Sequence, residues 1–169
     1  MEFKNTKSQI ILTLSSERTT ALLAKRIARS TETNLTFLLY GQVGTGKTFF
    51  ARKFIQEVLS SQGLFEDVPS PTYTLIQTYE TPKVDIWHAD LYRLVSYEDI
   101  IELGLIDAFD SNICLVEWPE KLEKNIPLNA VKIELSHHLE GERICTLTCE
   151  DEKVMANLKL IIKKLENDI

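Results

Sequence analysis

The octapeptide Gly-Gln-Val-Gly-Thr-Gly-Lys-Thr at residues 41–48 constrains the fold of this chain more than any other feature. It follows the apolar run 35–40, which has the length and composition of a strand buried on both faces of a sheet. It leads into residues 47–61, whose apolar side chains recur with helical spacing and which have Gly63 just beyond their end. A Gly-x₄-Gly-Lys-Thr pattern between a buried strand and a helix is typical of a phosphate-binding loop, or P-loop.

The residue types in this loop suit a triphosphate with Mg²⁺. Gly41, Gly44 and Gly46 let the backbone turn with positive φ, so that N–H groups and the positive end of the next helix face an anion. Lys47 can neutralise phosphate oxygens, and the Thr48 hydroxyl is a hard ligand suited to Mg²⁺. We therefore predict binding of ATP with Mg²⁺, because a chance glycine-rich turn would not need the flanking strand and helix. GTP is disfavoured, since the sequence lacks an Asn-Lys-x-Asp motif.

Two carboxylates are candidates for completing a magnesium shell or orienting the attacking water. Glu117 directly follows the apolar run 113–116, whereas Asp90 follows a more polar strand. An acid that ends a buried strand is costly without a partner, so we assign the metal to Glu117 and keep Asp90 as a second catalytic candidate. The alternatives are a solvent-facing Glu117 and a structural ion pair between Asp90 and Arg93.

Four further side chains lie near these positions in the sequence. Thr72 follows the segment Pro-Ser-Pro, where switch loops place a hydroxyl on the metal, although a capped turn has the same pattern. Trp118 and Tyr92 stand beside the two candidate acids, either as part of the site or as aromatics that pack on the sheet. His88 lies on a predicted strand, a pattern more typical of a structural histidine than of a catalytic base.

The rest of the pattern predicts a three-layer α/β fold with a mixed, mainly parallel central sheet and a C-terminal hairpin plus helix. Residues 1–169 are expected to form a single domain, since no linker or repeat divides them. Strands are expected over residues 8–14, 35–40, 74–79, 83–91, 112–118, 130–136 and 142–149. Helices are expected from residue 17, over 47–61 and 154–165, from Ser96 to about Gly104, and, as a short turn, from Pro119.

Charge and composition narrow the function classes. The net charge is −6 and no stretch concentrates Lys and Arg, so we expect no tight direct binding to nucleic acid. The chain shows neither a secretory signal nor an apolar run of membrane-spanning length, so we expect a cytoplasmic protein. Cys114, Cys145 and Cys149 are typical of small buried side chains rather than of a disulfide framework or a zinc site.

Four more blocks accompany the P-loop. They are Ser-Pro-Thr-Tyr-Thr-Leu at 70–75, His-Ala-Asp-Leu-Tyr-Arg-Leu at 88–94, Glu-Leu-Gly at 102–104 with Asp107 and Phe109, and Val-Glu-Trp-Pro-Glu at 116–120. In this order and spacing, over about residues 15–121, the chain resembles the bacterial TsaE (YjeE) ATPases. These serve the machinery that makes threonylcarbamoyladenosine in transfer RNA. The hairpin and the last helix resemble the family only in general pattern.

The resemblance implies a role for individual residues. Mg²⁺ would be held by Thr48 and Glu117, and Thr72 would belong to a mobile loop that senses the γ-phosphate. Phosphate binding would fall to Gly41, Val43, Gly44, Thr45, Gly46, Lys47 and Thr48. The residue pattern and the resemblance together give four catalytic candidates: Lys47, Glu117, Asp90 and Thr72.

Near the adenine, the resemblance points to Glu17 and to a basic residue just after the hairpin glycine. In this chain Gly141 is followed by Glu142 and only then by Arg143, so the basic contact is displaced by one position. Gln42 replaces the acid usual at the second loop position. Because the loop backbone binds the phosphates, that replacement should leave phosphate binding intact.

By resemblance, the chain is a slowly hydrolysing, Mg²⁺-dependent ATPase that drives or resets the threonylcarbamoyl-transfer complex, with TsaB and TsaD proteins as partners. Two other function classes remain open. A small-molecule P-loop kinase would need additional arginines and a lid over its acceptor, and the sequence shows no Arg-rich lid segment. A nucleotide-gated binding module would use nucleotide occupancy without requiring hydrolysis, whereas Glu117 argues for at least slow turnover.

Overall fold

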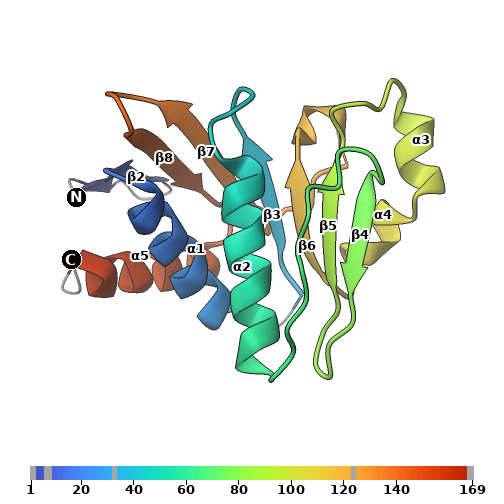
Figure 1. Cartoon of the computed structure of the whole chain (residues 1–169), viewed down its shortest axis with the longest axis horizontal. Coiled ribbons are helices and arrows are strands. Elements are labelled where there is room, and N and C mark those ends of the chain that lie inside the picture. The colour runs from blue at the N-terminus through green and yellow to red at the C-terminus, as the bar shows by residue number, and fades with distance from the viewer. Residues whose placement is uncertain (1–2, 6–8, 32–33, 123–124, 167–169) are drawn as a thin grey trace.

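The computed structural model describes residues 3–5, 9–31, 34–122 and 125–166. Its eight strands form one sheet in the order β1-β2-β8-β7-β3-β6-β5-β4 (Figure 1). The strands are β1 (Phe3–Asn5), β2 (Gln9–Leu14), β3 (Thr36–Tyr40), β4 (Ile76–Tyr79), β5 (Ile86–Asp90), β6 (Ile113–Glu117), β7 (Val131–His137) and β8 (Arg143–Thr148). The helices are α1 (Glu17–Arg29), α2 (Lys47–Ser61), α3 (Tyr97–Glu102), α4 (Leu105–Ala108), the 3₁₀ helix η1 (Pro119–Leu122) and α5 (Glu152–Glu166).

Parallel pairing is confined to the centre of the sheet. Strands β7, β3, β6 and β5 are parallel neighbours. The pairs β1–β2, β2–β8, β7–β8 and β4–β5 are antiparallel, so that β2 points the same way as the four central strands. The predicted α/β class and mixed sheet are confirmed. Strand β6 is buried along its whole length and β3 along all but its last residue, as expected for strands covered on both faces.

Helices cover the two faces of the sheet unequally. Helices α1, α2 and α5 pack on one face and share a core with apolar side chains from β2, β3, β7 and β8 (Figure 1). A smaller cluster on the other face joins α3, α4 and η1 to β3, β5 and β6. Along β7 buried and exposed residues alternate, which is typical of a strand with one face open to solvent. The three layers that the sequence predicts are therefore complete only over the parallel half of the sheet.

Several element boundaries differ from the sequence-based expectation. Strand β1 and helix α4 were not predicted, because three residues and four residues are too short to show a period. Strand β4 begins at Ile76 rather than at residue 74, since the Leu75 N–H donates to the Pro71 carbonyl in a turn and Leu75 has φ +67°. The predicted start of β2 at Ser8 lies outside the described residues.

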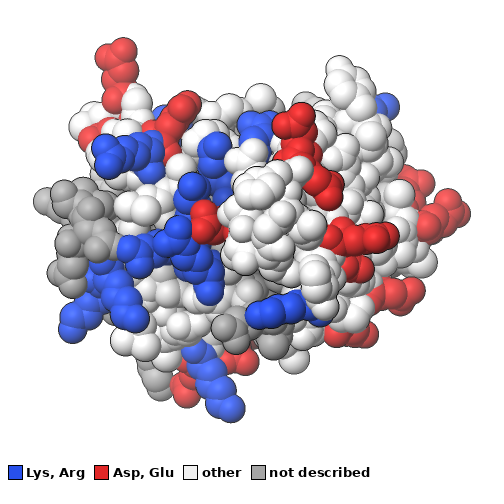
Figure 2. All heavy atoms as spheres, turned by 60° about the horizontal axis from the view of Figure 1, so that its bottom comes forward, with Lys and Arg blue, Asp and Glu red and all other residues white. Residues whose placement is uncertain are grey.

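The fold gathers basic side chains that are scattered in the sequence. The last turns of α1 and α5 carry Arg26, Arg29, Lys163 and Lys164, and a small hollow of about 180 Å³ between the helices is lined by three of them. Figure 2 shows Lys and Arg mainly on the left of the face in view and Asp and Glu mainly on the right. The sequence itself has no stretch rich in Lys and Arg, so this grouping arises only from the fold. The absence of tight nucleic-acid binding stays a prediction.

The three cysteines are buried, as the sequence predicts. Burial raises the pKa of Cys114 and of Cys145 to about 12, because the thiolate would lose its hydration. These thiols are therefore packing residues. Among the described residues, no helix is both long and apolar enough to cross a bilayer.

Candidate nucleotide-binding site

The P-loop turns where β3 ends, and its first glycine is required by space as well as by backbone angle. Gly41 has φ +133°, and a Cβ atom there would overlap the carbonyl oxygen of Leu135 on the neighbouring β7 and lie 2.8 Å from the Thr45 hydroxyl. Gly46 has φ +106° and is the N-cap of α2, with no side-chain cap. The first N–H groups of α2 are thus left without a side-chain acceptor and suit an anion.

The side chain of Lys47, which is predicted to bind phosphate oxygens, is folded back onto the P-loop. Its Nζ donates to the carbonyl oxygens of Gly41, at 2.6 Å, and Gln42, at 2.9 Å. The same ammonium lies 3.9 Å from the centre of the Trp118 ring, and the side chain is nearly buried. Burial lowers the pKa of Lys47, while the nearby carboxylates of Glu117, Asp90 and Glu120 oppose that effect. Among the described residues, the ammonium is bonded only to carbonyl oxygens, so a phosphate group would give this buried cation a fully charged partner.

Thr48 and Glu117, the two predicted metal ligands, are in direct contact. The Thr48 hydroxyl donates to Glu117 Oε2 at 2.7 Å, across 69 residues of sequence. The contact forms because β3 and β6 are parallel neighbours, which places the end of β6 beside the first turn of α2. Adjacent oxygens in an octahedral Mg²⁺ shell lie about 3 Å apart, so the pair fits two neighbouring ligand positions. Among the described residues, no group of three or more His, Cys, Asp or Glu side chains is arranged to hold a metal ion.

Glu117 has a second partner, which the sequence did not reveal. His88 Nε2 lies 3.0 Å from Glu117 Oε1, and both side chains are buried. His88 was predicted to be a structural residue rather than a base. The sequence could not pair it with Glu117, because the contact arises only from the parallel register of β5 and β6.

Asp90 holds the loop that contains Thr72. Its Oδ2 accepts from the Thr72 hydroxyl at 2.6 Å, and its Oδ1 accepts from the Tyr92 backbone N–H at 3.0 Å. The alternative of an ion pair between Asp90 and Arg93 is not what the structure has. Arg93 instead reaches the carbonyl oxygens of Thr72 and Tyr73 at 3.4 and 3.5 Å. Asp90 and Arg93 therefore hold the same loop from two sides.

The two aromatic residues lie at the rim of the site rather than deep in the core. Trp118 has φ +59°, a backbone conformation that non-glycine residues seldom adopt. Its ring lies 4.9 Å from that of Tyr92, which is more than half exposed. Trp118 also packs against the smaller core cluster, so it joins that core to the P-loop through Lys47.

The two residues predicted to contact adenine, Arg143 and Glu17, lie near the P-loop and near the start of α1. Arg143 Nε donates to the Thr45 carbonyl at 3.2 Å, so the displaced basic residue does reach the P-loop. Glu17 is the exposed first residue of α1, whose N-cap Ser16 forms a capping box with Thr19. Leu14 pairs with Arg143 between β2 and β8, which brings the start of α1 near that arginine.

A cleft beside the P-loop was not foreseen from the sequence. Its volume is about 620 Å³, and its walls come from the end of β3, the P-loop, the middle of β7 and the residues that follow β5 and β6. The lining residues are Tyr40, Gly41, Gln42, Val43, Tyr92, Trp118, Glu120 and Glu134. Glutamates on its wall disfavour a bound phosphate there, and the phosphates are expected instead at the loop backbone.

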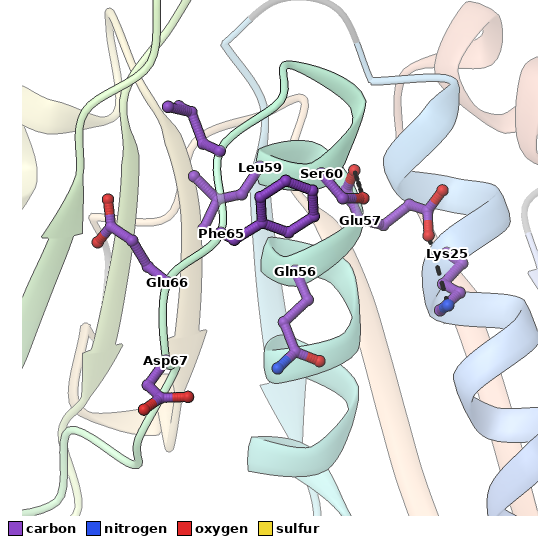
Figure 3. Close-up of a pocket in the computed structure, with 9 residues that line it drawn as sticks. Lys25, Gln56, Glu57, Leu59, Ser60, Phe65, Glu66 and Asp67 are labelled. Carbon is purple, nitrogen blue, oxygen red and sulfur yellow. Dashed lines mark hydrogen bonds and ion pairs between the residues drawn. The ribbon is translucent and has the colours of Figure 1, made fainter.

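A second cavity lies along the other half of α2, away from the P-loop (Figure 3). It measures about 460 Å³, and Glu57 on its wall pairs with Lys25 of α1 at 3.6 Å. None of its lining residues is a predicted site residue, so it does not belong to the nucleotide site. The predicted loop residues 41–48, Thr72, Asp90 and Glu117 meet at the carboxyl ends of the parallel strands, where α/β sheets bind ligands.

Comparison with known proteins identifies the family. A family model described as "Threonylcarbamoyl adenosine biosynthesis protein TsaE" matches residues 14–145. A Rickettsia bellii protein named tRNA threonylcarbamoyladenosine biosynthesis protein TsaE is 39% identical over 137 residues, which cover 81% of this chain and 93% of the relative. A Bacillus subtilis protein of the same name is 31% identical over 137 residues, covering 80% and 82%.

The fold agrees with this match. The crystal structure of Bacillus subtilis YdiB superposes with a TM-score of 0.72 at 22% identity and covers 97% of this chain and 98% of that one. At that identity the likeness supports the fold alone. Taken with the family match over most of the chain, the sequence and the fold lead to one conclusion: the chain belongs to the TsaE family, which takes part in threonylcarbamoyladenosine biosynthesis.

Proposed function

We propose that this chain is a Mg²⁺-dependent ATPase of the cytoplasm that drives or resets the assembly that transfers the threonylcarbamoyl group to transfer RNA. The observation that supports this most strongly is the contact between Thr48 and Glu117, which joins the P-loop to a buried carboxylate on the next strand. Such a pair is what a P-loop needs to hold Mg²⁺ against the β- and γ-phosphates. TsaB and TsaD proteins are the proposed partners.

Each residue of the site has a defined task in this proposal. The backbone of residues 43–48 binds the phosphates, and Lys47 exchanges its bonds to the loop carbonyls for bonds to phosphate oxygens. Thr48 and Glu117 would hold Mg²⁺, and the ion would supply positive charge near the phosphates. Arg143, which donates to the Thr45 carbonyl, and Glu17 at the start of α1 contact the adenine.

Thr72 and Asp90 form the part that distinguishes ATP from ADP. In the structure the Thr72 hydroxyl donates to Asp90, and Ser70 lies 2.8 Å from the same hydroxyl. A γ-phosphate with its metal would compete for the Thr72 hydroxyl and draw the loop into another arrangement, and hydrolysis would release it. The loop would then report which nucleotide is bound to a partner docked on it.

The rival functions make different predictions about the phosphate. A kinase would transfer it to a small acceptor, which could bind in the cleft beside the P-loop. A gated binding module would dock in the ATP state without needing turnover. These rivals can be separated by following the γ-phosphate and the docking in one experiment.

That experiment uses ATP labelled in the γ-phosphate and the chain with and without its TsaB and TsaD proteins. We expect slow release of inorganic phosphate that requires Mg²⁺, is lost in Lys47→Ala, and changes rate when the partners are added. Label recovered in a small molecule other than phosphate would favour the kinase. The gated module would be favoured if a variant that cannot hydrolyse ATP still docks in a nucleotide-dependent way and supports repeated cycles of the partner complex.

A further inference from the structure

His88 lies directly behind the carboxylate assigned to Mg²⁺. It is in the middle of β5 with no exposed surface, and β5 is the parallel neighbour of β6, whose last residue is Glu117. The ring nitrogen Nε2 lies 3.0 Å from Glu117 Oε1. The other carboxylate oxygen, Oε2, accepts from Thr48 at 2.7 Å. One oxygen of Glu117 thus faces the protein interior, and the other faces the P-loop.

The surroundings of His88 fix which nitrogen carries the proton. Among the described residues, Nδ1 is buried and has no hydrogen-bond partner. A proton on Nδ1 would be a buried donor without an acceptor, and it would leave the lone pair of Nε2 facing the Glu117 carboxylate. A proton on Nε2 has the Glu117 carboxylate in front of it. The geometry therefore favours a proton on Nε2, which donates to Glu117 Oε1.

Glu117 needs such a donor, because a carboxylate that is 2% exposed cannot rely on water for hydrogen bonds. With Oε1 bound from behind, rotation about the last bond of the side chain is restricted, and Oε2 is kept toward Thr48. Residues that hold a metal ligand in this way commonly change metal affinity or activity by 10- to 100-fold when they are replaced.

We propose that His88 is a positioning residue: it donates from Nε2 to Glu117 Oε1 and thereby presents Oε2 and the Thr48 hydroxyl as one preformed pair for Mg²⁺. The inference rests on the proposed function insofar as the metal is Mg²⁺ bound with ATP. It gives His88 no part in proton transfer, and it assigns a task to a residue that the nucleotide chemistry otherwise leaves unused.

Two variants at this position test the donor separately from the bulk of the ring. His88→Gln places a side-chain N–H near the position of Nε2, whereas His88→Leu keeps a side chain of moderate size without a donor. His137→Leu, on the exposed hairpin, is the matched control. Calorimetric titration of ATP is carried out for each variant over a series of Mg²⁺ concentrations and in EDTA.

We expect His88→Leu to weaken the Mg²⁺-dependent part of ATP binding by about 10- to 100-fold and to lower kcat, while ATP binding in EDTA is unchanged. His88→Gln should stay within a few-fold of the parent, and His137→Leu should match it. If His88→Leu and the parent respond equally to Mg²⁺, the histidine only fills space and the proposal is overturned. A parent protein whose ATP binding ignores Mg²⁺ would instead contradict the proposed function.

A spectroscopic measurement on the unmodified protein keeps the proposal testable even if His88→Leu does not fold. Long-range ¹H–¹⁵N correlation spectra distinguish the two neutral ring forms, and the signals of His88 are assigned by their loss in His88→Gln. We expect a single form with the proton on Nε2 for His88 and rapid averaging for the exposed His137 and His138. A proton on Nδ1 of His88 would overturn the assignment.

Discussion

The two walls of the nucleotide site are built in different ways. The P-loop wall is eight consecutive residues whose shape is set by glycine backbone angles and by the start of α2. The opposite wall joins the Thr72 loop and the ends of β5 and β6, and side-chain hydrogen bonds connect these segments. Those bonds link residues 18 positions apart for Thr72–Asp90 and 29 positions apart for His88–Glu117.

This difference shows which wall can respond to the nucleotide. The backbone of the P-loop is fixed by local sterics, so nucleotide binding should change it little. The opposite wall depends on a few hydroxyl–carboxylate contacts that a γ-phosphate and Mg²⁺ can replace. Under the proposed function, we therefore expect the first wall to bind the nucleotide and the second wall to report which nucleotide is bound.

The largest expected effect is on the P-loop wall. Lys47→Ala and Thr48→Ala should each reduce ATP hydrolysis by about 10² or more, because each removes a charge or metal contact at the transferring phosphate. Steady-state phosphate release, with circular dichroism to verify folding, measures this. Turnover near that of the parent in both variants would refute the site assignment.

The next prediction ranks the two acids of the opposite wall. Glu117→Ala should lower Mg²⁺-dependent turnover by roughly 30- to 100-fold, since Glu117 contacts Thr48 and is assigned to the metal. Asp90→Ala should cost roughly tenfold, because Asp90 acts through the Thr72 loop. Steady-state rates over a range of Mg²⁺ concentrations decide the order. The reverse ranking would make Asp90 the main hydrolytic acid.

A stability measurement tests whether the P-loop shape is set locally. Gly63→Ala, at φ +74° in open space, should cost about 1–2 kcal/mol through backbone strain alone. Gly41→Ala should cost about 2 kcal/mol more, because its Cβ would meet the Leu135 carbonyl oxygen of β7. Urea unfolding of the two variants gives both values. Equal costs would show that close approach to β7 is not what requires glycine.

The smallest expected effect concerns the reporting loop. Thr72→Val keeps the shape of the side chain and removes the hydroxyl that donates to Asp90, so we expect about a tenfold loss of hydrolysis with ATP binding nearly unchanged. Thr74→Val, an exposed position in the same loop, is the matched control and should have no effect. If both variants behave like the parent, the loop has no part in sensing the γ-phosphate.

The same contrast explains how much could be predicted from the sequence. Helix α2 has the predicted bounds, and the glycines of the P-loop have the predicted positive φ, because both depend on neighbouring residues. The contacts of Asp90 and His88 could not be predicted, because they require the register between strands that are distant in the sequence. The cleft walled by Trp118, Tyr92 and Glu134 was missed for the same reason.

The central claim is that the opposite wall reports the nucleotide state to a partner, and docking affinity tests it most directly. The chain is titrated calorimetrically into its TsaB–TsaD complex with a non-hydrolysable ATP analogue and Mg²⁺, with ADP, and without nucleotide. A ligand shifts an equilibrium only through its differential affinity, so we predict docking at least several-fold tighter in the ATP-like state than in the empty state. Equal affinities in the three states would contradict the account.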